Sequence, residues 1–235
     1  MSKSVLILGA ASDIGLAIAH EFAREKAGVI LAAREPGRLE ADAVDLRVRY
    51  GTEVTVTEFD ILRTDRHDAF LDGLPALPDV VVCVVGLLTG QAELVMQTNF
   101  NAPALMLEAV AARMEARGTG SIVGISSVAG DRGRASNYVY GSAKAGFTAF
   151  LSGLRNRLAA KGVQVVTVKP GFVRTKMTAG MKLPGPITAE PKEVGAAVLA
   201  AVERKRDVIY VRPVWRLIMT IIRLIPETIF KRLSL

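Results

Sequence analysis

The stretch that decides the fold is VLILGAASDIGLAIAHEF, residues 5–22. A strand-length apolar run leads directly into a glycine-containing turn, and the residues after the turn have helical periodicity. In a βαβ unit such a turn lets backbone N–H groups and the helix N-terminus meet a pyrophosphate, because glycine permits close approach. We therefore expect the turn to bind a dinucleotide through Gly9, Ser12, Asp13, Ile14 and Gly15. A structural explanation stays open, since such turns also favour Gly, Ser and Asp for capping, and Asp13 fits a helix N-cap.

Strands and helices alternate along the rest of the chain. Short apolar runs predict strands near 5–9, 28–33, 52–59, 79–86, 120–126, 162–170 and 207–211. Segments of helical period lie near 14–26, 36–50, 64–73, 94–117, 138–161 and 190–204. This alternation predicts βαβ units with right-handed crossovers and a parallel sheet that is covered by helices on both faces. The expected fold class is α/β, a doubly wound (Rossmann) sheet of about seven strands in a single domain.

Length and composition favour one large domain. The chain has 235 residues, of which 50% are apolar, and it shows no internal repeat or low-complexity linker. We expect a dinucleotide-binding and catalytic domain over residues 1–212, with an irregular, mobile, Pro- and Gly-rich substrate loop at 172–190. Residues 213–235 form an apolar and basic tail, in which Pro226 kinks or ends any helix.

The positive charge is concentrated near the C-terminus. Residues 203–235 contain eight Lys or Arg and three acidic residues, so they contribute +5 of the formal net charge of +7. The folded body lacks the basic stripe with aromatic platforms that is typical of nucleic-acid binding, so no nucleic-acid partner is expected. No uncharged run is long enough to predict a membrane-spanning helix.

Cysteine usage and the N-terminus bear on the compartment. The single cysteine, Cys83, cannot form an intramolecular disulfide, and its apolar surroundings predict a small buried hydrophobic residue. No basic leader precedes the first apolar run. These features predict a reducing, cytoplasmic location. The sequence predicts no metal site.

The residue after the second predicted strand bears on the cofactor. The chain there is LAAREPGRLE, residues 31–40. An acidic side chain at this place hydrogen-bonds the 2′-hydroxyl of NAD, whereas an arginine makes a charge-assisted bidentate contact with the 2′-phosphate of NADP. Arg34 therefore favours NADP(H) over NAD(H). Two alternatives stay open: Arg34 is a solvated arginine at a strand end, and Arg38 either assists it or only lies on a helix surface.

A second informative stretch is YGSAK, residues 140–144, in a predicted helix. Tyr140 and Lys144 lie four residues apart and therefore share one helix face. A free tyrosine, with a pKa of about 10, is a reluctant proton carrier at neutral pH, and a cation one turn away lowers that pKa. We therefore expect Lys144 to tune Tyr140 as a proton donor. The small residues 141–143 between them suggest room for a nicotinamide ribose.

YGSAK, preceded by ISSVAG at residues 125–130, resembles the short-chain dehydrogenase/reductase family, and the match covers nearly the whole chain. The resemblance implies that Tyr140 and Lys144 are the catalytic Tyr-x-x-x-Lys pair and that Lys144 also hydrogen-bonds the nicotinamide ribose. It implies further that Ser127 donates to or orients the substrate oxygen. Asn99, in QTNFNAP, would hold a water that relays protons to the lysine.

Neighbouring residues compete for these roles. Tyr138 is an alternative to Tyr140, but only Tyr140 has a lysine at i+4. Ser126 competes with Ser127, and the family spacing to the tyrosine favours Ser127. Asn101 competes with Asn99, and either asparagine also fits a simple turn-stabilising role.

The resemblance implies further cofactor contacts. Asp60 ends the third strand, where the family contacts adenine, and Gly86 follows the fourth strand. KPGFVRT, residues 169–175, matches the Pro-Gly turn after the sixth strand, which places Pro170, Gly171, Val173 and Thr175 along the nicotinamide.

The chain departs from the family pattern at two places. Leu8 replaces the usual threonine and Asp13 the middle glycine of the first turn, and CVVG, residues 83–86, replaces Asn-Asn-Ala-Gly. A carboxylate near a pyrophosphate is electrostatically unfavourable. Asp13 must therefore either cap the helix facing away or be answered by a neighbouring donor.

The expected activity is that of an NADPH-dependent carbonyl reductase, or in reverse an alcohol dehydrogenase, that transfers hydride to a ketone. The first turn resembles the branch of the decaprenylphosphoryl-2-keto-pentose reductase, which implies a lipid-linked keto-sugar. Three alternatives remain: a 3-oxoacyl thioester, a steroid-like ketone, and a non-catalytic NADP-binding scaffold.

The tail and the helices suggest two further partners. Apolar residues of the tail are expected near one face: Trp215, Ile218, Ile222, Ile225, Ile229 and Phe230. This face packs on its own domain or a sister subunit, or it lies on an anionic bilayer at the inner membrane surface or covers a greasy substrate. The family resemblance suggests a homodimer or homotetramer built on 94–117 and 138–161.

Overall fold

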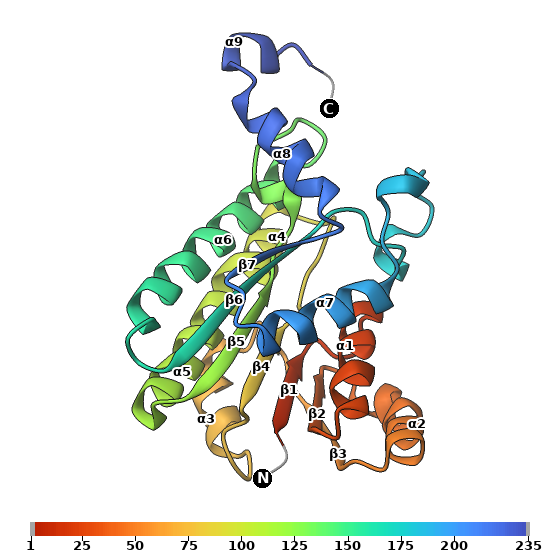
Figure 1. Cartoon of the computed structure of the whole chain (residues 1–235), viewed down its shortest axis with the longest axis vertical. Helices are drawn as coiled ribbons and strands as arrows, with labels where there is room; N and C mark the ends of the chain where they lie inside the picture. Colours follow the sequence, from red (N-terminus) through yellow and green to blue (C-terminus); the bar gives the residue numbers. More distant parts are fainter. Residues whose placement is uncertain (1–2, 234–235) are drawn as a thin grey trace.

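The computed structural model describes residues 3–233. Its seven parallel strands form one sheet in the order β3-β2-β1-β4-β5-β6-β7 (Figure 1). The strands are β1 (Ser4–Leu8), β2 (Gly28–Ala33), β3 (Val54–Glu58), β4 (Val80–Cys83), β5 (Gly120–Ile125), β6 (Val163–Pro170) and β7 (Val208–Val211). Each predicted strand is present, and the predicted doubly wound α/β fold is confirmed.

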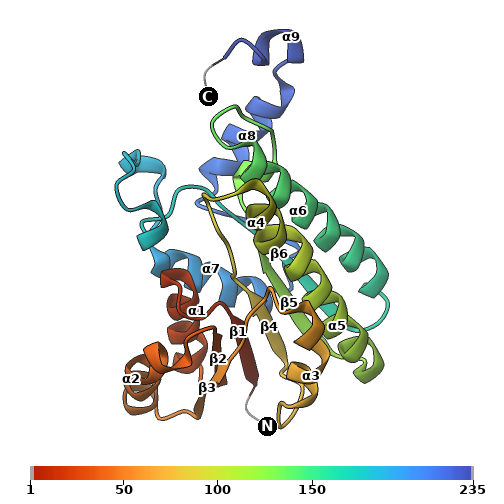
Figure 2. The ribbon, with the colours of Figure 1, turned by 180° about the vertical axis from the view of Figure 1, so that it is seen from behind.

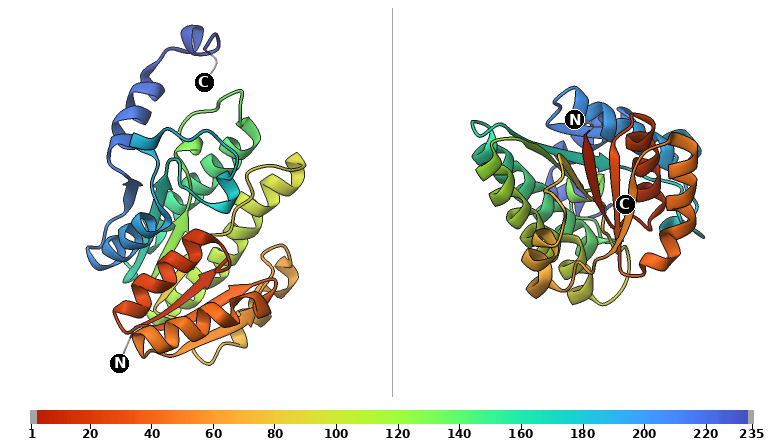
Figure 3. Two further views of the ribbon diagram at one scale, coloured as in Figure 1. Left: turned by 90° about the vertical axis from the view of Figure 1, so that its right-hand side faces the viewer. Right: turned by 90° about the horizontal axis from the view of Figure 1, so that it is seen from below.

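Helices cover both faces of the sheet. They are α1 (Asp13–Arg24), α2 (Glu40–Tyr50), α3 (His67–Asp72), α4 (Ala92–Met96), α5 (Ala102–Arg117), α6 (Tyr138–Leu158), α7 (Pro191–Glu203), α8 (Val214–Leu224) and α9 (Glu227–Phe230). One buried cluster joins the sheet to α1, α2 and α7, and the other joins it to α3, α5 and α6. Figures 2 and 3 show the two layers from behind and from the side.

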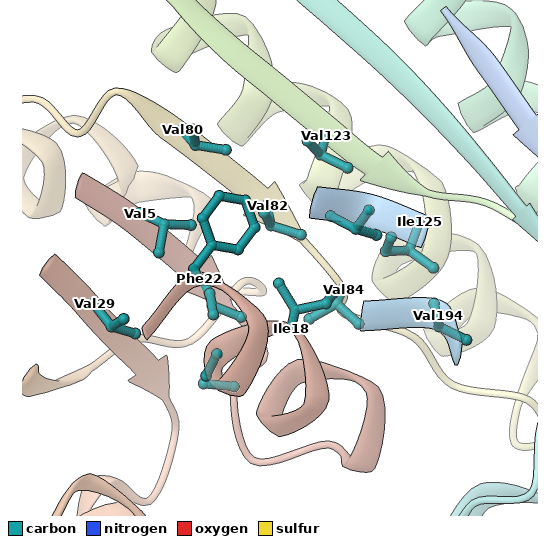
Figure 4. Packing of buried hydrophobic residues seen from close by; sticks show 14 of the residues in the cluster. Val5, Ile18, Phe22, Val29, Val80, Val82, Val84, Val123, Ile125 and Val194 are labelled. Carbon is teal, nitrogen blue, oxygen red and sulfur yellow. The ribbon is translucent and has the colours of Figure 1, made fainter. Parts of the chain in front are cut away.

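The apolar strands are buried on both faces, as a parallel sheet between two helical layers requires. In β1, Val5 and Ile7 belong to the cluster of α1, whereas Leu6 and Leu8 belong to that of α5 and α6. Phe22 of α1 lies over the strands among valines of β1 and β4 (Figure 4). This burial holds the carboxyl ends of the strands, and the turns that follow them, in fixed positions.

The strand order reverses between β1 and β4, which is where doubly wound sheets bind ligands. Leu8 pairs with Cys83 in register, so the turns after the two strands adjoin. Gly9 in the first turn has φ 91°, and a Cβ there would lie 3.1 Å from Val85 N. Glycine is therefore required at this position both by its backbone conformation and by the neighbouring turn.

The helix predicted over 94–117 is divided. A π-helical turn at Gln97–Asn101 separates α4 from α5. π turns occur mostly as short insertions in α-helices, frequently at functional sites. This one contains Asn99, whose side chain is buried and bonded to main-chain groups.

The C-terminal residues form two helices, α8 and α9, at one end of the molecule (Figure 1). Trp215 and Met219 of α8 are buried in a small cluster with Val128. The expectation that Ile229 shares the packed face is wrong, because the chain turns at Pro226 and leaves 53% of Ile229 exposed. No helix within residues 3–233 is long and apolar enough to cross a membrane.

Candidate active site

Ser12 is the N-cap of α1. Its Oγ accepts a hydrogen bond from Gly15 N at 3.0 Å and donates one to Gly9 O at 2.9 Å. A Cβ on Gly15 would lie 2.8 Å from Gly9 O, so only glycine allows the helix to begin this close to the turn. Of the two alternatives for Asp13, the helix cap is excluded, because the serine hydroxyl already satisfies the first-turn N–H.

The Asp13 carboxylate instead accepts a hydrogen bond from a neighbouring backbone N–H. Its Oδ2 accepts a hydrogen bond from Lys176 N at 2.6 Å, in the segment 172–190. The carboxylate thus ties the start of this segment to the first turn of α1. Ile14, the next residue, packs against the apolar cluster beneath α1 and does not line the cleft described below.

A cleft of about 410 Å³ follows the carboxyl ends of β1 to β4. Its lining includes five of the predicted cofactor contacts: Gly9, Ser12, Arg34, Asp60 and Gly86. A larger hollow of about 890 Å³ lies between α1, α2 and the segment 172–190. The first cleft is the candidate dinucleotide site, because its glycine turn and its arginine are the groups that pyrophosphate and a ribose phosphate require.

Charged groups line the β2 and β3 end of this cleft. Asp60 Oδ1 accepts a hydrogen bond from Leu62 N at 3.0 Å, which fixes the carboxylate at the cleft edge. Arg38 Nε pairs with Glu35 Oε2 at 2.9 Å. Arg34, in contrast, makes no ion pair within residues 3–233. Its guanidinium is therefore available to an anion, whereas that of Arg38 is partly neutralised.

Lys144 does not line the cleft itself but lies buried behind Gly86, which does. Only 3% of it is exposed, and its Nζ donates a hydrogen bond to Ile125 O at 3.0 Å. Burial lowers the pKa of Lys144 from 10.5 to about 8. A Cβ on Gly86 would lie 3.7 Å from Lys144 Nζ, so this glycine links the lysine to the cleft that Gly86 lines.

Tyr140 lies beside both Lys144 and Ser127. Lys144 Nζ is 5.8 Å from the centre of the tyrosine ring. Burial raises the pKa of Tyr140, and a hydrogen bond with the Ser127 hydroxyl acts in the opposite direction. The expectation of a lowered tyrosine pKa is therefore not met in the protein alone, because removing the phenolate from water outweighs the nearby donors.

The small residues of YGSAK have a packing role. A Cβ on Gly141 would lie 2.8 Å from Ala129 O, in the short 3₁₀ turn Val128–Gly130 that follows Ser127. Ala143 is fully buried in the core, and Ser142 is exposed. The expectation that these residues make room for a ribose is wrong for Gly141 and Ala143. Gly141 lets α6 approach the turn that follows Ser127.

The two serines after β5 have different surroundings. Ser127 Oγ accepts a hydrogen bond from Ala129 N at 3.1 Å and faces the Tyr140 hydroxyl. Ser126 Oγ donates to Lys144 O at 3.0 Å and lies 2.6 Å from Thr148 Oγ1. Ser126 therefore fastens the end of β5 to α6, whereas only Ser127 is next to the tyrosine hydroxyl.

This difference predicts that one alanine variant loses turnover and the other loses stability. Ser127→Ala should lower kcat by about 100-fold, because a donor near the reacting oxygen is lost. Ser126→Ala should instead reduce the free energy of unfolding by about 1–3 kcal/mol, because it leaves buried partners unpaired. Steady-state kinetics and urea unfolding of both variants check this. A larger kinetic loss in Ser126→Ala would contradict the assignment.

Asn99 is held entirely by the main chain. Its Oδ1 accepts from Leu87 N at 3.1 Å, and its Nδ2 donates to Leu87 O at 2.7 Å and to Val95 O at 2.8 Å. A Cβ on Gly86 would lie 3.3 Å from Asn99 Oδ1. Asn99 thus fixes the loop after β4, whose glycine lies next to Lys144. Asn101 lies outside this arrangement, since its side chain bonds to Gln97 Oε1 at 2.8 Å.

The Pro-Gly turn after β6 does not line the cleft. Pro170 ends β6, and a Cβ on Gly171 would lie 1.9 Å from Trp215, so the glycine is required by the indole of α8. Val173 is buried and bridges to Ala189. Thr175 hydrogen-bonds through its N–H to Thr178 Oγ1 at 3.1 Å and borders the larger hollow. Of these predicted nicotinamide contacts, none lines the cleft, and Gly171 has a packing role.

Met177 also lines the cleft, and sequence reasoning did not select it. Its Cε would lie 3.9 Å from a Cβ on Gly86. The residue follows Lys176, whose N–H bonds to Asp13, so this hydrogen bond fixes the segment beside the cleft. A lone methionine in an irregular segment has no periodic signal, and the contact joins distant parts of the chain.

We compared the sequence and the structure with known protein families. The family model for short chain dehydrogenases matches residues 3–183. The chain belongs to this family. It is therefore an NAD(P)-dependent oxidoreductase, and the resemblance inferred from YGSAK and ISSVAG is confirmed.

Relatives match this chain over most of its length. An uncharacterized oxidoreductase of Mycobacterium tuberculosis is 35% identical over 241 residues, which cover 97% of this chain and 96% of the relative. The ketoacyl reductase HetN of Nostoc is 29% identical over 219 residues, covering 86% of this chain and 76% of HetN.

Two solved structures of similar proteins contain nicotinamide cofactors. A short-chain dehydrogenase from Sphingobium yanoikuyae in complex with NADPH has a TM-score of 0.82 and 27% identity, and the match covers 96% of this chain and 97% of that one. A 3-oxoacyl-[acyl-carrier protein] reductase from Brucella melitensis in complex with NAD has a TM-score of 0.79 and 27% identity, covering 90% and 96%. Cofactors with and without the 2′-phosphate thus occur among similar folds.

Proposed function

We propose that this short-chain dehydrogenase reduces a ketone with NADPH and that Tyr140 is the proton donor. The observation that carries the proposal is that a residue lining the cleft lies next to the buried ammonium of Lys144. Gly86 lines the cleft and lies next to Lys144 Nζ, and Tyr140 lies between Lys144 and the Ser127 hydroxyl. A donor, a cation and a hydroxyl therefore lie together behind Gly86, at the edge of the cleft.

The residues divide the chemistry as follows. When bound, the reduced nicotinamide supplies a hydride to the carbonyl carbon. The Ser127 hydroxyl donates to the carbonyl oxygen and orients it toward Tyr140. Tyr140 then transfers its hydroxyl proton to that oxygen as negative charge develops there. Its raised pKa keeps the proton in place until this moment.

Lys144 supports the phenolate that Tyr140 leaves behind. A charge in a buried site interacts more strongly than in water, so an ammonium near the ring stabilises the developing anion. Ile125 O holds the ammonium at 3.0 Å and fixes its direction. Asn99 and Gly86 keep the adjoining loop in place. A water that Asn99 binds and that relays protons to Lys144 is part of the same proposal.

The unpaired Arg34 supports NADP(H) as the preferred cofactor. Arg34→Ala should weaken NADPH binding by roughly 10- to 100-fold, because a charge-assisted contact with the 2′-phosphate is lost, and should leave NADH binding within about twofold. Arg38→Ala is the matched control, since Glu35 already pairs with Arg38. Fluorescence titration with both cofactors measures this. Equal losses for NADPH and NADH would contradict the preference.

Ketone reduction itself is tested with deuterium-labelled NADPH and a panel of ketones. The panel should contain keto-sugars, 3-oxoacyl thioesters and steroid-like ketones. We expect the label to appear on the carbinol carbon of one class. Tight NADPH binding without transfer to any ketone would favour the alternative, a non-catalytic NADP-binding scaffold.

A lipid-linked keto-sugar is the second candidate substrate. The observation that favours it is the position of α8. Val128, the residue after Ser127, packs against Trp215 and Met219 of this helix. The apolar surface of the tail thus lies one residue from the proposed substrate-binding hydroxyl. We further infer a homodimer or homotetramer built on α5 and α6, which cross-linking and light scattering would test.

A further inference from the structure

The outward side of α8 carries a row of exposed apolar residues. Leu217, Ile221 and Leu224 are 62%, 56% and 76% exposed, and Val214 begins the row at 40%. Their spacing of three or four residues places them on one helix face. Ile229 and Leu233 add exposed apolar surface beyond Pro226. Single exposed apolar residues are ordinary, but a contiguous row marks an interaction surface.

The opposite side of α8 holds the helix firmly on the domain. Trp215 Nε1 donates a hydrogen bond to Ile187 O at 2.9 Å. Arg132 Nη1 donates to the last carbonyls of the helix, Ile222 O at 3.3 Å, Arg223 O at 3.0 Å and Ile225 O at 2.8 Å. These bonds satisfy carbonyls that a helix end leaves without partners. The exposed row is therefore presented by an ordered helix, and docking would require little further ordering.

Arg132 also fixes α9. Its Nη2 pairs with Glu227 Oε2 at 2.7 Å, and its guanidinium lies 4.0 Å from the centre of the Phe230 ring. Glu227 is the one acidic residue between 208 and 233. Its side chain is 74% exposed, and its charge is paired with an arginine of the domain.

Apart from Glu227, which is paired with Arg132, the exposed charges around the row are positive. Arg216 and Arg223 lie along one edge of it, and Lys231 and Arg232 follow beyond α9. None of the four makes an ion pair within residues 3–233. A second copy of the same face would therefore bring like charges together. An anionic partner with an apolar interior satisfies both the charges and the row.

We propose that this α8–α9 face docks on an anionic lipid bilayer. The face consists of Val214, Leu217, Ile221, Leu224, Ile229 and Leu233 with Arg216, Arg223, Lys231 and Arg232. The 11 residues of α8 are too few to span a bilayer. The helix lies in the plane of the interface, with its row among the acyl chains and its arginines at the phosphates. Because docking needs only this face, it stands or falls independently of the ketone reductase activity.

The site and the docking face lie at the same end of the molecule. The inner side of α8 contacts Val128, next to Ser127, and Trp215 covers Gly171. Figure 3 shows α8 beside the loops at the carboxyl ends of β5 and β6. Docking therefore brings the side of the domain that carries Val128 and Ser127 toward the bilayer surface.

Vesicle flotation of the full chain tests the proposal. Vesicles of phosphatidylcholine alone are compared with vesicles that contain phosphatidylglycerol. We expect binding to the anionic vesicles to exceed binding to the neutral ones by at least about tenfold and to weaken with added NaCl. Equal binding to both compositions, or no binding to either, overturns the proposal.

Matched variants separate the row from the charges. Leu217→Ser/Ile221→Ser/Leu224→Ser should lower the partition coefficient by more than about tenfold. Val44→Ser/Val48→Ser is the control, since these two valines are exposed on α2, far along the chain. Arg216→Gln/Arg223→Gln should lower the partition coefficient on anionic vesicles by roughly 20-fold. Arg204→Gln/Arg206→Gln is the control and should change it little.

Two further measurements keep the result interpretable. Circular dichroism and NADPH titration of the triple variant show whether the domain remains folded. Light scattering shows whether the row joins copies of the chain. The proposal is overturned if the triple variant binds anionic vesicles as well as the control variant does. It is also overturned if wild-type protein does not bind vesicles and the triple variant has a lower oligomer mass.

Discussion

Tyr140→Phe is expected to lower kcat for ketone reduction by at least about 1,000-fold, because general acid catalysis typically contributes 100- to 10,000-fold. The phenyl ring keeps the packing of α6 but has no proton to give. Binding of NADPH should stay within about threefold, since the hydroxyl contributes little to the affinity of the whole dinucleotide. Single-turnover kinetics and cofactor titration of the variant measure both values.

Tyr138→Phe provides the matched control. Tyr138 starts the same helix, but 64% of it is exposed and it has no lysine one turn later. The control should therefore retain wild-type turnover. Comparable losses in the two variants would mean that α6 tolerates no change there, and retained turnover in Tyr140→Phe would refute its role as proton donor.

Lys144→Met is expected to lower kcat by about 100-fold and to change its pH dependence. The buried ammonium has a pKa of about 8, so it is charged below this pH and neutral above it. Because Tyr140 has a raised pKa, it stays protonated through the same range. Reductive turnover of the wild-type chain should thus fall above about pH 8 with the loss of one proton, and the variant should lack this decline.

The same lysine makes a stability prediction with a definite sign. Its pKa is lowered from 10.5 to about 8, so between these values the unfolded state binds more protons than the folded state. The free energy of unfolding should therefore rise as pH increases through this window, and burial of the charged form costs stability below it. Urea unfolding of the wild type and Lys144→Met at pH 7 and 10 checks this. A wild-type stability that falls across the window, relative to the variant, would contradict the lowered pKa.

The fold was accessible from the sequence because its signals are local. The run 80–85 is apolar throughout, as a strand buried on both faces favours, and 162–170 is rich in valine. The glycine turn after β1 and the i, i+4 spacing of Tyr140 and Lys144 are also contained within single elements. Ser12 and Asp13 show the limit of such reasoning, because both residues fit a cap and only the hydrogen bonds decide between them.

The remaining features depend on contacts between distant parts of the chain. Asp13 meets Lys176 N across 163 positions, and Gly171 is required by Trp215 of the tail. The space that the glycine of YGSAK leaves free is filled by Ala129 O. A glycine in the sequence shows that space is needed, but not which neighbour occupies it. The raised pKa of Tyr140 likewise follows from burial, which one helix cannot reveal.

A crystal structure with NADPH tests the central claim most directly, since it locates the nicotinamide relative to the three polar side chains. We predict that the dinucleotide occupies the cleft from Arg34 to Gly86, with its nicotinamide end beside Lys144, Tyr140 and Ser127. A cofactor bound in the hollow between α1 and α2, or Tyr140 and Lys144 turned away from the nicotinamide, would contradict the account.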